Sequence, residues 1–195
     1  MQVDSLPAEP LEKPNLALYT PTFFSRHQLL VRRLLVSTAP SLRSWAQLFL
    51  SLITETYTAF LNQWYEIVPK STEMNPHWTN WAYLWHRGAI LLRDDSAMNL
   101  SPEFYREFAA PYDNLLLDRF GGGCVHFCGR GDHYIDTLSE IPDLYAINMS
   151  QPHLNDMEKI FLQTVDKGIK VLAFNKGWAE RLKCREGGYH HNLSI

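Results

Sequence analysis

The chain has 195 residues, 46% of them hydrophobic and 13% aromatic, which is enough apolar material for one domain with its own core. Lys and Arg total 18 against 21 Asp and Glu, so the formal net charge of -3 offers no basic footprint for nucleic acid or anionic lipid. The longest apolar runs fall far short of the roughly 20 residues that span a bilayer, and MQVDSLPAEP is not a secretory signal. We expect a globular protein that binds neither nucleic acid nor membrane.

The three cysteines, Cys124, Cys128 and Cys184, are few and odd in number. Such a set does not suit a disulfide framework, which small secreted domains use to staple a fold. We therefore expect a reducing compartment, the cytoplasm.

The N-terminal part divides into an arm and two helices. Residues 1–21 contain several prolines and little periodicity, so we expect an extended arm, followed by a single domain over 22–195. Apolar residues recur at helical spacing over 22–36 and again over 41–68, where Ser41 is a candidate N-cap. The next segment, 71–88, carries Trp78, Trp81 and Trp85, which we interpret chiefly as packing under a loop.

Four strand-helix units follow. Their expected strands are AILLRDD (89–95), CVHFCG (124–129), LYAINMS (144–150) and IKVLAF (169–174), and each precedes a helical pattern. Ser101 and Pro102 resemble an N-cap and first helical residue, Pro111 interrupts the first long helix, and Asn155 with Glu158 resembles a capping box. Repeated strand-helix units predict an α/β fold with four parallel strands, and we expect the helices of 22–68 to cover an open sheet edge.

The segment GAILLRDDSAMNLSPEFYREFAAPYDNLLLDRFGGGCVHFCGRGDHY resembles the C-terminal half of the uroporphyrinogen decarboxylase superfamily. The resemblance continues through INMSQPHLNDMEKI and covers roughly residues 55–183. It implies a fold of the TIM-barrel type, here a half barrel with extra N-terminal helices. The superfamily includes cofactor-free uroporphyrinogen decarboxylases and corrinoid-linked methyltransferases that use zinc to activate a thiol, so the resemblance predicts a fold better than a reaction.

In a barrel of this type the chemistry lies at the carboxyl ends of the strands. Side chains alternate along a strand, so Cys124, His126 and Cys128 share one face, while Val125 and Phe127 pack against the helices. The residues expected at one shared mouth are Asp94, Asp95, His126, Cys128, Asn148, Ser150 and Asn175.

His126 and Cys128 are the candidate metal ligands, because zinc binds imidazole and thiolate and a catalytic zinc site has three protein ligands. The alternative is a buried histidine with a backbone partner beside an inert core cysteine. In the methyltransferases the resembling residues bind zinc, with a further cysteine near the last strand. Here Cys184 lies ten residues beyond the last strand, so Cys184, His133 and Cys124 all remain candidates for the third ligand.

Asp94 and Asp95 are the candidate catalytic residues, since carboxylates at a barrel mouth can orient a substrate or act as acid or base. We favour Asp95 as the one that faces inward. The alternative is that they cap turns or pair with Arg93. Gly121–Gly123 precede a strand rather than open a helix, which favours a tight turn over a phosphate loop.

Three functions remain open from the sequence. The first is zinc-thiolate methyl transfer to a small thiol from a methylated donor such as a corrinoid protein. The second is porphyrinogen decarboxylation assisted by a buried acid, although an arginine-rich N-terminal element like that of the decarboxylases is not recognisable here. The third is a non-catalytic half barrel that binds a ligand or partner, and an uncovered sheet edge would favour self-association into a homo-oligomer.

Overall fold

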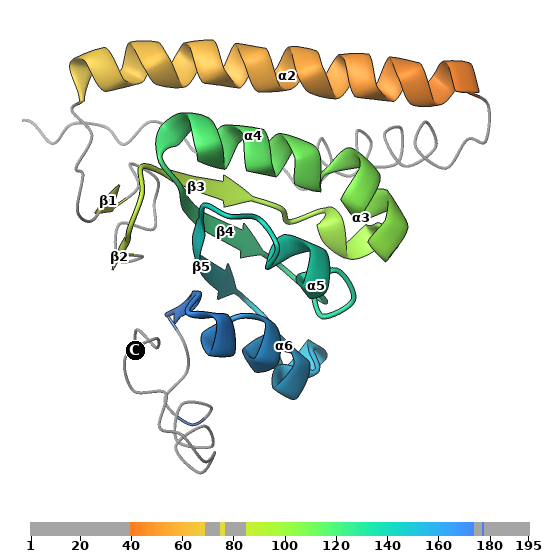
Figure 1. Ribbon diagram of the computed structural model, residues 1–195, viewed down its shortest axis with the longest axis vertical. Helices are drawn as coiled ribbons and strands as arrows, with labels where there is room; N and C mark the ends of the chain where they lie inside the picture. The colour runs from red at the N-terminus through yellow and green to blue at the C-terminus, as the bar shows by residue number, and fades with distance from the viewer. Residues whose placement is uncertain (1–39, 69–74, 77–84, 174–176, 178–195) are drawn as a thin grey trace, which may run out of the picture.

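The computed structural model describes residues 40–68, 75–76, 85–173 and 177 of the chain (Figure 1). The sequence-based expectations for the arm of 1–21, the helix of 22–36, Trp78, Trp81, Asn175, the helical pattern of 178–183 and Cys184 lie outside these residues. Among the described residues, no helix is long and apolar enough to cross a membrane.

A four-stranded parallel sheet forms the centre of the fold. Its strands are β3 (Ile90–Arg93), β4 (Gly123–Phe127), β5 (Leu144–Met149) and β6 (Lys170–Leu172), and they lie side by side in chain order. All three pairings are parallel, as the repeated strand-helix units predict. The register brings Arg93 opposite His126, and His126 opposite Asn148, so polar residues of three strands lie at the same level.

The first crossover consists of two helices, α3 (Pro102–Phe108) and α4 (Ala110–Phe120). The Ser101 hydroxyl caps α3 by accepting a hydrogen bond from the backbone N–H of Phe104 at 3.3 Å. Pro111 marks the boundary because it lacks a backbone donor, and Ala109 separates the two helices. Both sequence predictions are therefore confirmed. Gly121, with φ 75°, ends α4 in the left-handed conformation.

The second and third crossovers contain short helices, α5 (Ile135–Leu138) and α6 (Met157–Gln163). The expected capping box at Asn155 is wrong, because Asp156 is the residue that caps α6 and accepts from Lys159 N at 3.2 Å. The Asn155 side chain instead accepts from Gly131 N at 2.7 Å and Asp132 N at 3.1 Å. It ties the loop after β4 to the loop after β5.

The two faces of the sheet differ. Val125 and Phe127 belong to the main core together with helix residues such as Leu117 and Ile135. Cys124, on the alternate face, packs with side chains of the other strands, namely Leu91, Ala146 and Leu172. The alternation predicted along residues 124–128 is confirmed, and the helices cover one face of the sheet.

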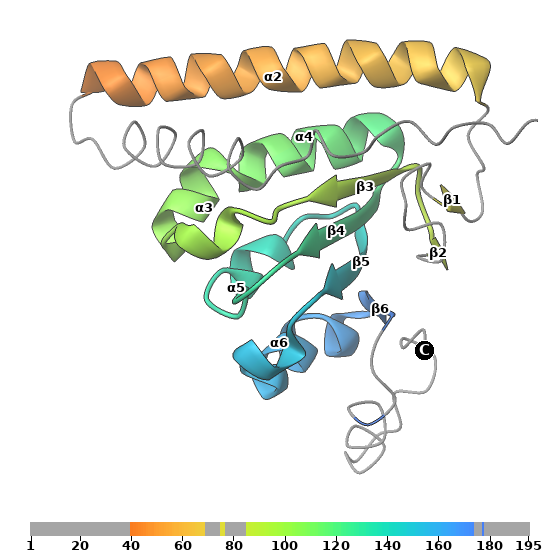
Figure 2. The same cartoon turned by 180° about the vertical axis from the view of Figure 1, so that it is seen from behind.

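The long helix α2 (Pro40–Ile67) lies along α4 (Figures 1 and 2). Arg119 of α4 pairs with Glu55 at 2.8 Å, and Tyr112 donates to the backbone oxygen of Gln47 at 3.0 Å. Tyr65 donates to the oxygen of Ala89 just before β3. The helix thus packs mainly on the helical layer, and it reaches the β3 edge of the sheet through Tyr65.

A two-residue antiparallel pair, β1 (Asn75–Pro76) with β2 (Trp85–His86), precedes the sheet. It lies in the stretch that the sequence analysis interprets as a loop. At Gly88 and Gly122 the chain then turns with positive φ into β3 and β4.

Candidate metal centre

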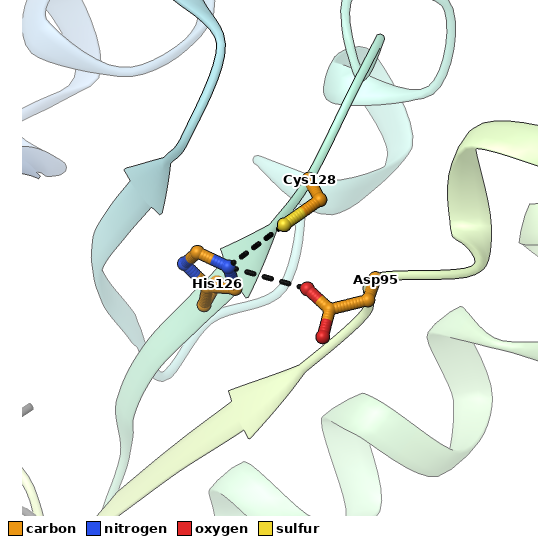
Figure 3. Close-up of side chains that lie close together, drawn as sticks. All are labelled: Asp95, His126 and Cys128. Carbon is orange, nitrogen blue, oxygen red and sulfur yellow. Dashed lines mark hydrogen bonds and ion pairs between the residues drawn. The ribbon is translucent and has the colours of Figure 1, made fainter. Parts of the chain in front are cut away.

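Three potential metal ligands meet where β3 and β4 end (Figure 3). His126 is the penultimate residue of β4, Cys128 follows its last residue, and Asp95 lies two residues beyond the end of β3. The ligand atoms of these three residues all lie within 4.8 Å of one another. The His126 ring is buried, whereas Asp95 and Cys128 are partly exposed.

The separations within this group suit a tetrahedral ion. His126 Nε2 lies 3.2 Å from Asp95 Oδ1 and 3.4 Å from Cys128 Sγ. Ligand distances of about 2.0–2.3 Å in tetrahedral zinc sites place neighbouring ligand atoms roughly 3.3–3.8 Å apart. Asp95 Oδ1 is also buried without a well-formed hydrogen bond from a described residue. The three side chains can therefore hold a metal ion with only small movements.

Asn148 of β5 orients the His126 ring. Its Nδ2 donates to the oxygen of Leu172 at 2.9 Å, so its Oδ1 must face His126 Nδ1, at 2.5 Å. An amide oxygen only accepts, hence His126 Nδ1 carries the proton and donates it. Nε2 is then the nitrogen directed at Asp95 and Cys128, where it can donate to the Asp95 carboxylate in the metal-free protein or present its lone pair to a metal, as in metal-ligating histidines held by an outer acceptor.

The carboxylate of Asp95 is held in its ionised form. Its contact with the His126 ring is the main cause that lowers its pKa to about 2, and Arg93, 3.0 Å from Oδ2, contributes. The expected pairing of an aspartate with Arg93 is therefore present at Asp95. It leaves Oδ1 directed to the metal group.

Cys128 is protonated at neutral pH when no metal is bound. Burial raises its pKa, and the neighbouring Asp95 carboxylate raises it further. Its thiol donates to Ser150 Oγ at 3.4 Å. A metal that takes the thiolate must displace this proton.

Asp94 points away from the group into the helical layer. The hydroxyl of Tyr105 lies 3.2 Å from Asp94 Oδ2 and 3.0 Å from Oδ2 of the buried Asp113. Burial raises the pKa of Asp94 to about 6, and burial together with the Asp94 charge raises that of Asp113 well above its usual range. The two carboxyls also hydrogen-bond to each other, and such a pair shares a proton because both groups cannot ionise cheaply away from water.

The third member of the group is Asp95, which differs from the third ligands expected from the sequence. His133 Nε2 contacts the oxygen of Leu100 at 2.9 Å, and Cys124 is fully buried between strands, where burial raises its thiol pKa strongly. Cys184 lies outside the described residues. The sequence signal for Asp95 is its place at the end of an apolar strand, and its meeting with His126 follows from the β3–β4 register, in which Arg93 pairs with His126.

Met98 occupies the space next to Gly129, beside the three ligands. A side chain added at Gly129 would lie 2.5 Å from the sulfur of Met98, so Met98 fills the room next to Cys128. Gly129 N donates to Gln151 Oε1 at 2.6 Å, which holds this loop in place.

No family model, no curated protein and no solved structure matches this chain, so the chemistry of the group rests on its own geometry.

Proposed function

We propose that Asp95, His126 and Cys128 bind a zinc ion and that the protein transfers a methyl group to a thiol. The observation that carries the proposal is the convergence of one carboxylate, one imidazole and one thiol within 4.8 Å at the carboxyl ends of adjacent parallel strands. Three protein ligands and one free position are characteristic of catalytic zinc sites, whereas structural sites are closed by four.

The chain's own residues have separate roles in this proposal. Asn148 fixes the ring so that Nε2 of His126 is the ligand atom. Asp95 and the Cys128 thiolate each contribute one negative charge. The two charges together favour the binding of a divalent cation. Arg93, 3.0 Å from Asp95 Oδ2, and Ser150, whose Oγ lies 3.4 Å from Cys128 Sγ, are the polar neighbours of the ligands that would contact the substrate. When bound, zinc lowers the pKa of a thiol ligand, which makes a thiol substrate nucleophilic near neutral pH.

The methyl donor in the proposal is a corrinoid-bound or otherwise methylated group. The substrate thiol releases its proton to solvent, its sulfur forms the new bond to the methyl carbon, and the bond from the donor to that carbon breaks with its electron pair left on the donor. The four parallel strands with helices on one face suit a partial barrel, in which this site would form part of the mouth. A corrinoid protein would approach from that mouth.

Metal analysis tests the proposal. Purified protein should contain about one zinc per chain, and Cys128→Ser and Asp95→Asn should each lose most of it. Asp94→Asn is the matched control. Asp94 is next to Asp95 in the chain but faces Tyr105, so this variant should keep the metal. The zinc-loaded protein should methylate small thiols from methylcobalamin. Wild-type protein that binds no zinc, or an Asp95→Asn, Cys128→Ser double variant that keeps it, would refute the site.

A second candidate function is porphyrinogen decarboxylation, and Asp94 is the observation that favours it. A carboxyl with a pKa of about 6 can be protonated near neutral pH and can act as the acid that protonates a pyrrole ring. Turnover of uroporphyrinogen by metal-free protein, lost in Asp94→Asn, would favour this function over methyl transfer.

A further inference from the structure

The side of α2 that faces away from α4 carries an apolar stripe, which the exposed polar residues Thr56 and Gln63 interrupt. Trp45, Leu52 and Ile67 expose 65%, 63% and 77% of their surface. Between them, at steps of three, four or seven residues, lie further exposed apolar side chains, namely Leu48, Phe49, Ile53 and Phe60. This spacing places all of them on one face of the helix.

The opposite side of α2 packs against the rest of the domain. Leu61 is fully buried there in the main core, and Ala46 packs with Phe108 of α3. The only charged residues of α2 are Arg43, Glu55 and Glu66. Arg43 and Glu55 form ion pairs with Glu107 and Arg119 of the neighbouring helices, so they are drawn toward the domain and away from the stripe.

The stripe is large enough for a stable interface. Seven large side chains that expose about half or more of their surface amount to roughly 700–800 Å², which is the area that each partner buries in an interface of standard size. Monomeric proteins rarely expose an apolar patch of this size. The size of the stripe therefore indicates an interaction surface.

Four of the seven stripe residues are arranged symmetrically about Thr56, an exposed residue near the centre of the stripe. Leu52 and Phe60 lie four residues on either side of Thr56, and Trp45 and Ile67 lie eleven residues on either side. A second α2 that runs antiparallel across a two-fold axis at Thr56 therefore places Leu52 against Phe60 and Trp45 against Ile67. Two-fold symmetric interfaces require this self-complementary arrangement, and antiparallel helix dipoles favour it slightly.

We infer that α2 is the interface of a homodimer, in which two copies of this chain pack their apolar stripes antiparallel around Thr56. The inference is independent of the metal centre, which lies at the carboxyl ends of β3 and β4. Light scattering on the full chain should give twice the monomer mass of 22.6 kDa. Leu52→Lys and Phe60→Glu should each weaken dimerisation at least about tenfold, the loss expected when a buried apolar contact is replaced by a charge.

Two further variants make the test specific. In the Leu52→Lys, Phe60→Glu double variant each lysine faces a glutamate of the partner, so the dimer should return. Ser51→Lys is the matched control, because Ser51 is exposed next to Leu52 but lies off the stripe, and it should leave the dimer intact. Thr56→Cys should give a cross-linked dimer under oxidation, and Ser51→Cys should not.

Several outcomes would overturn the inference. One is a wild-type chain that stays monomeric up to about 100 μM, a weak affinity for an interface of this area. Another is a dimer that Leu52→Lys does not weaken, or a double variant as monomeric as its parents. A monomer whose melting temperature falls with Leu52→Lys but not with Ser51→Lys would identify residues 1–39 as the cover instead. All variants alter exposed positions, so circular dichroism should show an unchanged fold.

Discussion

His126 Nδ1 and Asn148 Oδ1 lie 2.5 Å apart on adjacent parallel strands, and this contact determines which ring nitrogen faces Asp95 and Cys128. If Asn148 orients a zinc ligand, Asn148→Ala should lower zinc affinity by about 10–100-fold, as for other outer partners of metal-bound histidines. Competition with a chelating dye measures the change. Asn99→Ala is the control, because Asn99 is exposed and bonds only within its own turn. Unchanged affinity in Asn148→Ala would argue against Nε2 ligation.

Zinc affinity should rise with pH. Burial raises the pKa of Cys128, so the metal-free thiol is protonated at neutral pH and one proton leaves as the ion binds. The apparent dissociation constant should therefore fall up to about tenfold per pH unit between pH 6 and 8. Asp95 stays ionised throughout, because its pKa is about 2. Titrations in two buffers of different ionisation enthalpy would count the proton, and an affinity independent of pH would exclude the thiolate as a ligand.

Much of the fold follows from local sequence signals. The alternation around His126 predicts which side chains face the helices, and the breaks at Pro111 and Gly168 follow from the backbone limits of proline and glycine. The cap of α6 was predicted one residue early, at Asn155. An asparagine and an aspartate in succession both suit a cap, and only the tertiary contact of Asn155 with Gly131 decides between them.

The site was predictable in part. His126 and Cys128 share a strand, so spacing alone places them together. The position of Asp95 depends on the register between β3 and β4, and the direction of Asp94 depends on Tyr105 and its contact with Asp113. Register and long-range hydrogen bonds are tertiary properties that a pattern along one strand does not encode.

Gly121 and Gly123, two positions apart, should respond differently to replacement by alanine. A Cβ at Gly123 would lie 1.8 Å from the backbone oxygen of Ile90, inside the β3–β4 pairing, so Gly123→Ala should separate the strands and cost several kcal/mol or prevent folding. A Cβ at Gly121 would meet no other atom, and only the backbone φ of 75° disfavours alanine there. Gly121→Ala should therefore lower the free energy of unfolding by about 1 kcal/mol. Urea unfolding of both variants measures the difference, and equal losses would contradict the close approach.

The buried carboxyls of Asp94 and Asp113 should make the protein less stable as the pH rises. Both pKa values are raised by burial, that of Asp94 from 3.8 to about 6. The folded state therefore binds more protons than the unfolded state above pH 4, and stability falls as pH increases through the folded pKa. For Asp94 the loss between pH 4 and pH 7 is on the order of 1–3 kcal/mol.

Asp113→Asn isolates this effect. Its amide can accept from Tyr105 and donate to the Asp94 carboxylate as the protonated Asp113 does, so the variant removes one of the two raised titrations and the decline in stability should flatten. Asp118→Asn, at an exposed position on the same helix, is the control and should keep the wild-type slope. Urea unfolding from pH 4 to pH 8, with a chelator present so that metal binding does not contribute, compares the three proteins. An Asp113→Asn protein that loses stability as steeply as wild type would show that the two carboxyls do not share a proton.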